Sequence, residues 1–258
     1  MQESWLREFQ SDWCLSGKSI KTATEYCRYI NHLHSYYKNP SLTAVKEWLQ
    51  MAPGASLRRK KAMAVRALGK WCEEAGVNYF KWWKQVPLVT EQVFPQPTVT
   101  EDVYRQVLAR CRTPRDKALI EVLWSSGLRR SEIERMKIEH LDFVGGFIVV
   151  PTSKANRPRV VPVSPPAVRA LRRLIGSRTE SSVFGMTGNA IRIRLVRLGA
   201  PSAHAWRRGW AVHALRRGVS ETSVKSAAGW RSGAMVSRYT NALSGELAIE
   251  EFRKALRN

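Results

Sequence analysis

The sequence has few acidic residues for its number of basic ones. Among 258 residues, 21 Asp and Glu stand against 43 Lys and Arg, which gives a formal net charge of +22 at pH 7. Both parts of the chain are basic: there are 14 basic and 8 acidic residues up to residue 95, and 29 and 13 beyond it. Such a large charge of one sign favours a polyanionic partner, and nucleic acid is the first candidate.

Cysteine is also scarce, and its spacing argues against two kinds of site. The sequence has four cysteines, none of them in a CxxC pair: Cys14, Cys27, Cys72 and Cys111. This spacing predicts neither a disulfide framework nor a zinc site, so we interpret the cysteines as reduced, buried small residues. We therefore predict no metal site.

Long hydrophobic runs are missing as well. No apolar run reaches the roughly 18 to 20 residues that a membrane span needs. The first residues, MQESWLREFQSDW, lack the basic region followed by an apolar stretch that marks a signal peptide. We expect a cytoplasmic protein with no membrane partner.

Apolar residues in the first 83 positions repeat at helical spacing. Trp5, Phe9 and Trp13 fall at i, i+4 and i+8, and Tyr26 and Ile30 begin a second stripe of the same kind. Gly76 can close the last helix of this part. The pattern predicts four amphipathic helices, at about residues 2–16, 20–37, 42–51 and 55–75.

Prolines mark the boundary between two expected domains. Pro87, Pro95 and Pro97 disfavour a regular helix, so residues 85–98 are interpreted as a linker between a helical domain, 1–84, and a second domain, 99–258. The second domain is predicted to be mainly helical, with Thr100 capping its first helix and one β-hairpin with strands at 147–151 and 159–163. The predicted fold class is mainly α with a small β-sheet.

Five short strings in the second domain carry most of its distinctive polar residues: SSGLRRSEIERM, TSKANR, SAHAWRRGWAVHAL, AAGWRS and SRYTNA. Each has an ordinary structural reading when taken alone. Arg129 and Glu132 could form an i, i+3 surface ion pair. Lys154 could be a solvated charge in a turn, and Trp230 and Tyr239 could be core aromatics.

Taken together and in order, the strings resemble the catalytic domain of the tyrosine recombinase, or phage integrase, family. That family carries an arginine in Gly-x-Arg-x-Ser-Glu, a hairpin lysine, a His-x-x-Arg helix, a His or Trp after glycine, and a nucleophilic tyrosine about nine residues later. This chain shows GLRRSE, TSKANR, HAWR, GW and RY, with 9 positions from Trp230 to Tyr239 and 35 from His204 to Tyr239. It departs at two places: Trp230 stands where many members have His, and Arg208 stands where a second histidine often follows.

The resemblance implies DNA strand exchange through a 3′-phosphotyrosine bond. Tyr239 would attack a backbone phosphodiester and release the 5′-hydroxyl, and His204 would accept the tyrosine proton. Arg129 and Arg207 would bind the non-bridging oxygens, because guanidinium groups are permanently charged and can hold two oxygens at once. Since the bond energy stays in the covalent enzyme, no cofactor is expected.

Three further residues take roles from the same resemblance. Lys154 would protonate the leaving 5′-oxygen. The indole N–H of Trp230 would add one neutral hydrogen bond to the phosphate, since this group is a donor only. Glu132 would support the site by holding Arg129 or a neighbouring loop.

The first domain resembles the helical, SAM-like core-binding domain of this family, through the stretch LREFQSDWCLSGKSIKTATEYCRYINHLHSYY. It would complete a clamp on double-stranded DNA, and the sequence resembles a short form without an additional arm-binding domain. A basic run is often only a solvated face, but the charge of +22 favours contact with the DNA backbone. The predicted DNA-binding residues are Lys21, Arg58, Arg59, Lys60, Lys61, Arg66 and Arg208.

The resemblance also implies an assembly, a homotetramer on synapsed core or attachment sites, compatible with a monomer when free. The amphipathic last segment, SGELAIEEFRKALRN, could pack on its own domain or on a neighbouring subunit. The expected activity is integration or excision of a phage or mobile element, in the host cytoplasm if the gene is phage-borne. Three alternatives stay open: a Xer-like resolvase, a catalytically inactive DNA-binding regulator, and a type IB topoisomerase.

Overall fold

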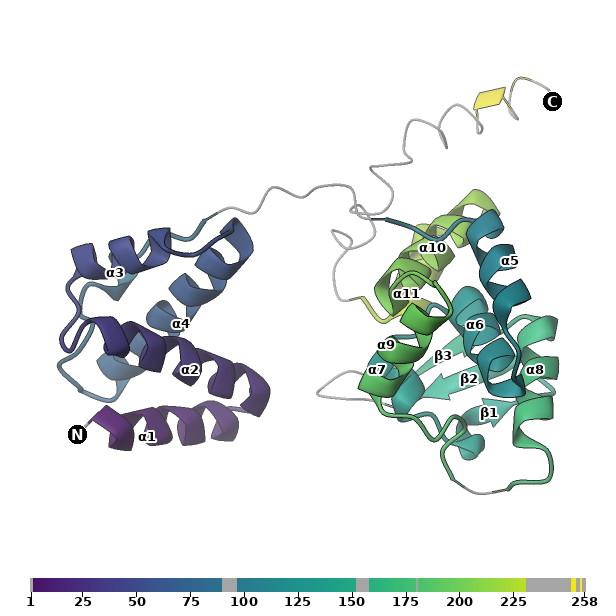
Figure 1. The fold of residues 1–258 in the computed structure, drawn as a ribbon, viewed down its shortest axis with the longest axis horizontal. Coiled ribbons are helices and arrows are strands. Elements are labelled where there is room, and N and C mark those ends of the chain that lie inside the picture. The colour runs from purple at the N-terminus through teal and green to yellow at the C-terminus, as the bar shows by residue number, and fades with distance from the viewer. Residues whose placement is uncertain are drawn as a thin grey trace. The chain divides into compact units, whose positions relative to one another are not determined.

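The computed structural model of the chain describes residues 2–89, 97–151, 158–179, 181–230, 252, 253 and 256. The chain divides into two compact units, Met1–Phe94 and Pro95–Asn258 (Figure 1). The described residues are mostly helical with one small sheet, which confirms the predicted fold class.

The first unit is built from helices alone in the part that the structure describes. They are α1 (Gln2–Leu15), α2 (Ile20–Tyr36), α3 (Leu42–Gln50), α4 (Ala55–Glu74) and the short 3-10 helix η1 (Trp83–Gln85). The four α-helices match the predicted ranges to within a few residues. Gly76 follows α4 with φ +69°, the left-handed conformation expected of a glycine that closes a helix. The helices bury one apolar core, in which the largest fully buried side chains are Phe9, Ile30, Leu33, Trp48 and Leu68.

The described ends of the expected linker pack against the two units. Val86 is 1% exposed in the core of the first unit, and its carbonyl accepts a hydrogen bond from Arg66 Nη1 at 2.9 Å. At the other end, the Pro97 carbonyl accepts from Arg208 Nε at 2.8 Å. The chain that connects these ends lies outside the described residues.

The second unit combines helices with one antiparallel sheet (Figure 1). Its strands, in the spatial order β1-β2-β3, are β1 (Leu141–Asp142), β2 (Phe147–Val150) and β3 (Arg159–Pro162). The predicted hairpin corresponds to β2 and β3, and β1 is a short additional strand that the sequence analysis did not predict. The helical elements are α5 (Glu101–Arg110), α6 (Pro114–Ser126), α7 (Arg130–Glu134), η2 (Ile138–His140), α8 (Pro165–Ile175), α9 (Gly188–Arg197), α10 (Ala203–Arg216) and α11 (Glu221–Ala228).

Helix α6 is the central helix of the second unit, because α5, α8 and α10 all pack against it (Figure 1). Leu119, Ile120 and Leu123 are fully buried, so this helix is apolar on several sides and not on one stripe. At its first turn, the buried Asp116 forms a bidentate ion pair with Arg194 of α9. Helix α6 therefore provides a fixed frame for the segment that follows it.

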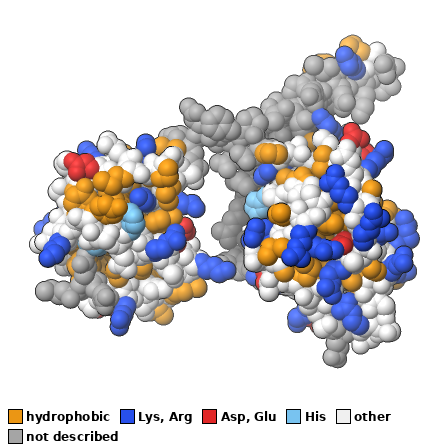
Figure 2. Space-filling model, in the orientation of Figure 1, with side chains coloured by type: hydrophobic (Ala, Val, Ile, Leu, Met, Phe, Trp, Pro, Cys, Tyr) orange, Lys and Arg blue, Asp and Glu red, His pale blue; other side chains and the backbone are white. Residues whose placement is uncertain are grey.

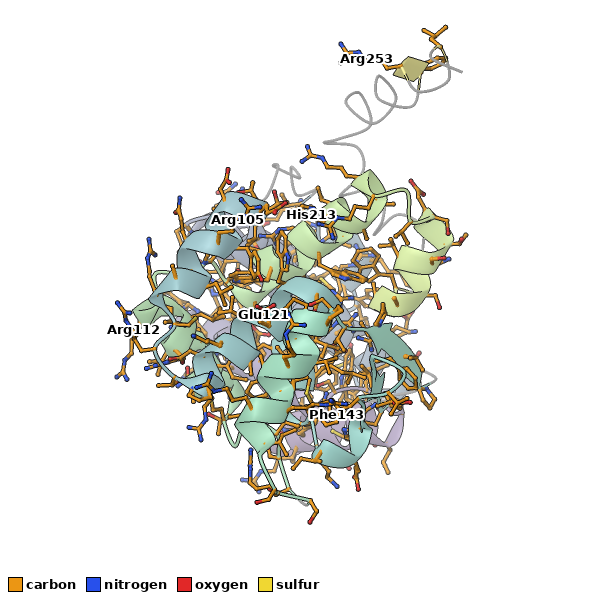
Figure 3. The ribbon with its side chains drawn as sticks, turned by 90° about the vertical axis from the view of Figure 1, so that its right-hand side faces the viewer. Arg105, Arg112, Glu121, Phe143, His213 and Arg253 are labelled. Carbon is orange, nitrogen blue, oxygen red and sulfur yellow. The ribbon has the colours of Figure 1, made fainter. Side chains whose placement is uncertain are left out.

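An aromatic cluster joins α5, α6 and α10 on the side of the unit seen in Figure 3. The Tyr104 ring stacks on the Trp124 ring with centroids 4.6 Å apart, and the His213 ring meets Trp124 edge-on at 4.4 Å. The Tyr104 hydroxyl donates to Glu121 Oε1 at 3.1 Å. Burial raises the pKa of Glu121 above its ordinary value. This cluster stabilises the packing of α10, the helix that carries His204 and Arg207.

Candidate active site

The predicted catalytic residues lie on three segments of the second unit. Arg129 directly precedes α7, His204 and Arg207 lie on α10, and Trp230 follows the end of α11. Lys154 and Tyr239 lie outside the described residues. The structure therefore bears on four of the six predicted catalytic residues and on Glu132.

Glu132 and Arg129 are joined in a compact turn at the start of α7. The Arg129 backbone N–H donates to Glu132 Oε2 at 2.7 Å, and Arg129 Nη1 donates to Glu132 Oε1 at 2.7 Å. The first contact satisfies a backbone donor at the helix N-terminus, as in half of a capping box. The Glu132 side chain is only 8% exposed, whereas that of Arg129 is 34% exposed. One carboxylate thus fixes both the backbone and the guanidinium of Arg129.

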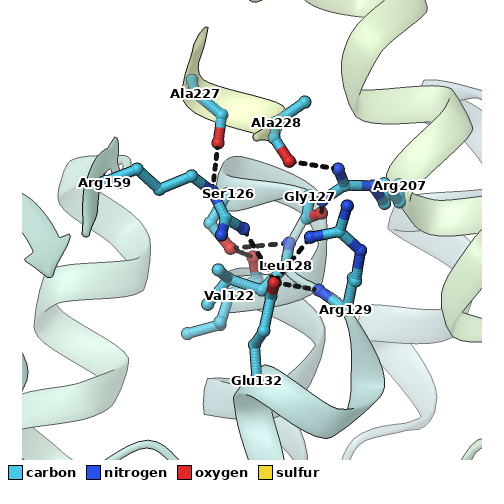
Figure 4. A network of polar contacts seen from close by, with 10 residues as sticks. All are labelled: Val122, Ser126, Gly127, Leu128, Arg129, Glu132, Arg159, Arg207, Ala227 and Ala228. Carbon is cyan, nitrogen blue, oxygen red and sulfur yellow. Dashed lines mark hydrogen bonds and ion pairs between the residues drawn. The ribbon is translucent and has the colours of Figure 1, made fainter. Parts of the chain in front are cut away.

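A second arginine, which the sequence analysis did not predict as a site residue, holds the same carboxylate. Arg159 Nη2 donates to Glu132 Oε2 at 2.8 Å, and Arg159 Nε donates to the Ala227 carbonyl at 2.8 Å (Figure 4). Burial by itself would raise the pKa of Glu132, but the hydrogen bonds from Arg159 and Arg129 hold it below its ordinary value. Glu132 is therefore ionised at neutral pH.

Arg207 is buried between two helix ends. Its side chain donates from Nη1 to the Gly127 carbonyl at 2.8 Å and from Nη2 to the Ala228 carbonyl, as Figure 4 shows. Gly127 closes α6 and Ala228 is the last residue of α11, so both acceptors belong to helix C-termini. Such carbonyls lack a partner within their own helix and carry partial negative charge, which suits a buried cation.

Gly127 has a backbone conformation that only glycine adopts easily. Its φ of +58° lies in the left-handed region, and a Cβ atom built on it would stand 2.5 Å from the Trp210 ring. This sharp helix end turns the Gly127 carbonyl toward Arg207 and leads within two residues to Arg129. In the motif GLRRSE, Gly127 is therefore required by backbone geometry, whereas Arg129 and Glu132 are required by charge.

Trp230 packs against Arg207 at the end of α11. The Arg207 guanidinium carbon is 5.2 Å from the Trp230 ring centroid, within the range of a cation–π contact. Trp230 is 7% exposed and shares a small apolar cluster with Trp210 and Val224. The ring is therefore a packing residue of α10 and α11 as well as a neighbour of Arg207.

His204 lies in the first turn of α10, beside several arginines. Its pKa is lowered below the ordinary 6.5 by partial burial first, and then by the positive charges of Arg208, Arg207, Arg129 and Arg130. The imidazole is therefore neutral at pH 7 and can accept a proton. Arg129 and Arg130, at the start of α7, are among these charges, so this segment lies near the first turn of α10.

The basic residues predicted to bind DNA in the first unit differ in their surroundings. Lys60 is exposed, with an ion pair to Glu25 at 3.8 Å, and Lys21 is exposed on α2. Lys61 is different: it is 6% exposed, and its ammonium lies 4.3 Å from the Trp48 ring centroid. Because Lys61 packs into the core of the first unit, we remove it from the proposed DNA-contacting set.

The arginines of this set make contacts with backbone carbonyls of their own units. Arg58 Nε donates to the Leu49 carbonyl at 3.2 Å, and Arg59 Nη1 donates to the Val89 carbonyl at 2.8 Å. Arg66 and Arg208 hold Val86 and Pro97 in the same way. These side chains stabilise the ends of each unit. They are partly exposed, so a contact with DNA is compatible with their positions and is proposed below.

Basic side chains also cover much of the second unit. In Figure 2, Lys and Arg are far more numerous than Asp and Glu on the face of this unit that is turned to the viewer. Among the residues that the structure describes, no group of His, Cys, Asp or Glu is placed to hold a metal ion. Nor does any described helix have the length and apolar character needed to cross a membrane.

A comparison with known families decides the assignment. The sequence model of the phage integrase family matches residues 97–246, more than half of the chain. The chain belongs to this family. The resemblance drawn from the five strings is thereby confirmed, and this integrase is a tyrosine recombinase, an enzyme of site-specific DNA cleavage and rejoining.

Similar proteins lie among the Xer recombinases. The integrase is 23% identical to tyrosine recombinase XerA of Pyrococcus horikoshii, over 95% of this chain and 92% of that one. It is 38% identical to tyrosine recombinase XerC of Xanthomonas axonopodis pv. citri, over 40% of this chain and 36% of that one. Among solved structures, a lambda integrase tetramer bound to a Holliday junction matches with a TM-score of 0.74 at 15% identity, over 92% of this chain and 76% of that one.

Proposed function

We propose that this integrase exchanges DNA strands at specific core sites through a 3′-phosphotyrosine intermediate, and that it integrates or excises a phage or mobile element. The observation that supports the proposal most strongly is the convergence of Arg129, Arg207 and His204 from segments far apart in the sequence. Two guanidinium groups and a neutral imidazole within one cluster suit the attack of a phenol on a phosphodiester.

The proposed reaction exchanges a DNA phosphodiester bond for a phosphotyrosine bond, so the bond energy is retained in the covalent intermediate. The Tyr239 oxygen bonds to phosphorus, the bond from phosphorus to the 5′-oxygen breaks, and the 5′-hydroxyl is released. His204 takes the phenol proton, and Lys154 gives a proton to the leaving oxygen. In the second step, the 5′-hydroxyl of a partner strand attacks the phosphotyrosine and restores the free phenol.

Charge stabilisation comes from groups that are already in place. The attacked phosphate gains negative charge on its non-bridging oxygens, and fixed donors stabilise it without reorganisation at the moment of reaction. Arg129 is held by Glu132, and Arg207 is held by two carbonyls. Trp230 lies against Arg207, where its indole N–H can serve the same phosphate.

The proposed substrate is double-stranded DNA, gripped by both units. Lys21, Arg58, Arg59, Lys60, Arg66 and Arg208 would contact the phosphate backbone. Such contacts predict an affinity that falls steeply with salt. The lambda integrase structure, a tetramer on a Holliday junction, supports a tetramer of this chain on two synapsed sites. We place the reaction in the cytoplasm, where a bacterial chromosome and an incoming phage genome meet; similarity to XerA and XerC keeps resolution of chromosome or plasmid multimers as an alternative.

A nicked suicide duplex of the core site tests the proposal. The nick lets a short 5′-ended fragment diffuse away, so the covalent adduct accumulates and appears on a denaturing gel. The wild type and Tyr36→Phe, a control at an exposed tyrosine of α2, are expected to form the adduct, and Tyr239→Phe is expected to form none. If the wild type binds DNA tightly but forms no adduct, the chain acts as a DNA-binding regulator and the proposed reaction is wrong. Relaxation of any supercoiled plasmid without joining of two sites would indicate a topoisomerase.

A further inference from the structure

Arg159 connects three elements that carry the site. It is the first residue of β3, and its backbone pairs with Val150, the last residue of β2, at the end of the hairpin that enters the connecting loop. Its side chain, 16% exposed, reaches Glu132 of α7 through Nη2 and the Ala227 carbonyl of α11 through Nε, each at 2.8 Å. One side chain thus links the sheet to both helical segments next to the predicted catalytic residues (Figure 4).

Each of these two contacts is one step from a catalytic arginine. The carboxylate that accepts from Arg159 is the one that fixes the backbone N–H and the guanidinium of Arg129. The residue after Ala227 is Ala228, whose carbonyl accepts from Arg207. A shift of Arg159 would therefore be transmitted to Arg129 through the Glu132 carboxylate and to Arg207 through the Ala227–Ala228 segment.

We infer that Arg159 is a positioning residue for DNA cleavage, which sets the two catalytic arginines relative to each other and to the loop end of the hairpin. The inference rests on the proposed function, since it concerns the same site. Arg159 acts through Glu132 and the end of α11 and is not assigned a contact with the phosphate.

The two contacts require an arginine. They leave the guanidinium from different nitrogens, Nε toward Ala227 and Nη2 toward Glu132, and the planar group holds these directions at a fixed angle. A lysine has one nitrogen at the end of a flexible stem, so it can keep the charge beside Glu132 but cannot hold both partners in the same geometry. The space is also close: a Cβ atom built on Gly229 would lie 3.1 Å from Arg159 Cδ.

Single-turnover cleavage of the suicide duplex by Arg159→Met and Arg159→Lys tests the inference. We expect the cleavage rate of Arg159→Met to fall about tenfold to a hundredfold, with the dissociation constant for the duplex changed by less than about threefold, because charged hydrogen bonds are lost without loss of a DNA contact. Arg159→Lys should recover only part of the rate. Arg173→Met, at an exposed arginine of α8, is the matched control and should cleave like the wild type.

Coupling to Glu132 separates positioning from a general loss of stability. In a Glu132→Gln background, the effect of Arg159→Met on the cleavage rate should shrink, since the two residues act through one contact. If Arg159→Met lowers the cleavage rate by the same factor in both backgrounds, the two residues act independently, which would contradict the inference.

Hydrogen exchange of the DNA-free protein gives a readout that does not depend on cleavage. Arg159→Met should speed exchange at the N–H groups of Gly229 and Trp230, which bond to carbonyls of α11. It should also speed exchange at the N–H of Ile133, which bonds to the Arg129 carbonyl, but not at Leu198, which follows α9. Unchanged exchange and rate, or a uniform increase across the second unit, would overturn the inference. Absence of adduct from the wild type would instead overturn the proposed function, and the exchange pattern would still decide whether Arg159 orders the two segments.

Discussion

Replacing Glu132 with glutamine should destabilise the second unit strongly, because the change removes a charge from a buried cluster at almost constant volume. The carboxylate accepts three hydrogen bonds, from Arg129 N–H, Arg129 Nη1 and Arg159 Nη2, at 2.7, 2.7 and 2.8 Å. In glutamine an NH₂ group replaces one of the two accepting oxygens, so a donor would face the N–H groups of Arg129 or Arg159. A charged hydrogen bond contributes about 1.5–3 kcal/mol, and the bond to the partly exposed Arg129 guanidinium counts for less because solvent screens it.

The expected loss in the free energy of unfolding is about 3–4 kcal/mol, close to the cost of removing one partner of a buried ion pair. Hydrogen exchange of the α6 and α7 amides in the intact chain measures it for the second unit separately. The α2 amides should not change. Glu139→Gln is the matched control, because Glu139 pairs with Lys137 at a side chain 67% exposed and should cost less than about 1 kcal/mol.

The pH dependence gives the sign of the same effect. The folded pKa of Glu132 lies below its ordinary value of 4.5, so the unfolded chain binds the proton more tightly than the folded one. The contribution of the carboxylate is therefore complete above pH 4.5 and is lost as the pH falls through the folded pKa. The difference in the free energy of unfolding between wild type and Glu132→Gln should become smaller in that pH range. A loss below about 1 kcal/mol at neutral pH, or a gap that does not change with acidification, would refute this reasoning.

Three further outcomes follow from the surroundings of single side chains. Lys60→Met should reduce the slope of log affinity for duplex DNA against log salt by about 0.9, whereas Lys61→Met should leave the slope unchanged; equal slopes for both variants would contradict this assignment. Arg208→Gln should raise the pKa of His204 toward 6.5, since Arg208 is the first of the charges that lower it, and NMR titration of the DNA-free protein measures this directly. Trp230→Phe should keep DNA binding but slow cleavage by about tenfold, because the indole N–H is lost; an unchanged rate would assign the ring to packing alone.

The helical elements could be predicted because burial repeats with the helical period. Phe9 and Ile30, which were assigned to apolar stripes, are buried in the first core, and Thr100 caps α5 by accepting a hydrogen bond from the Val103 N–H. The strand β1 was missed because two residues, Leu141 and Asp142, are too few to show an alternating pattern.

Lys61 shows where charge was a weaker signal than periodicity. It stands in the run RRKK, which suggested a basic surface, yet it is three, four and seven positions before Ala64, Val65 and Leu68, all of which are fully buried. The helical period alone places Lys61 on the inward side of α4. Its long apolar stem and a cation–π contact with Trp48 allow the position to be filled by lysine.

Arg159 was missed for a different reason, since its role depends on contacts distant in sequence. One sign was present: Arg159 and Val161 share a face of β3, and Val161 is fully buried. A charged residue on the inward face of a strand needs a partner, which here is Glu132. The sequence could indicate that a partner exists, but only the fold shows which carboxylate it is.

Arg207 illustrates how two helix ends can hold a buried cation, as its proposed role on a phosphate requires. The carbonyls of Gly127 and Ala228 are neutral dipoles, so these two contacts orient the guanidinium without neutralising its charge. Both helix ends are closed by glycines in the left-handed conformation, Gly127 at φ +58° and Gly229 at φ +65°. The glycines of GLRRSE and AAGWRS thus belong to the same electrostatic arrangement as the arginines. They end α6 and α11 at the points where the carbonyls of Gly127 and Ala228 accept hydrogen bonds from Arg207.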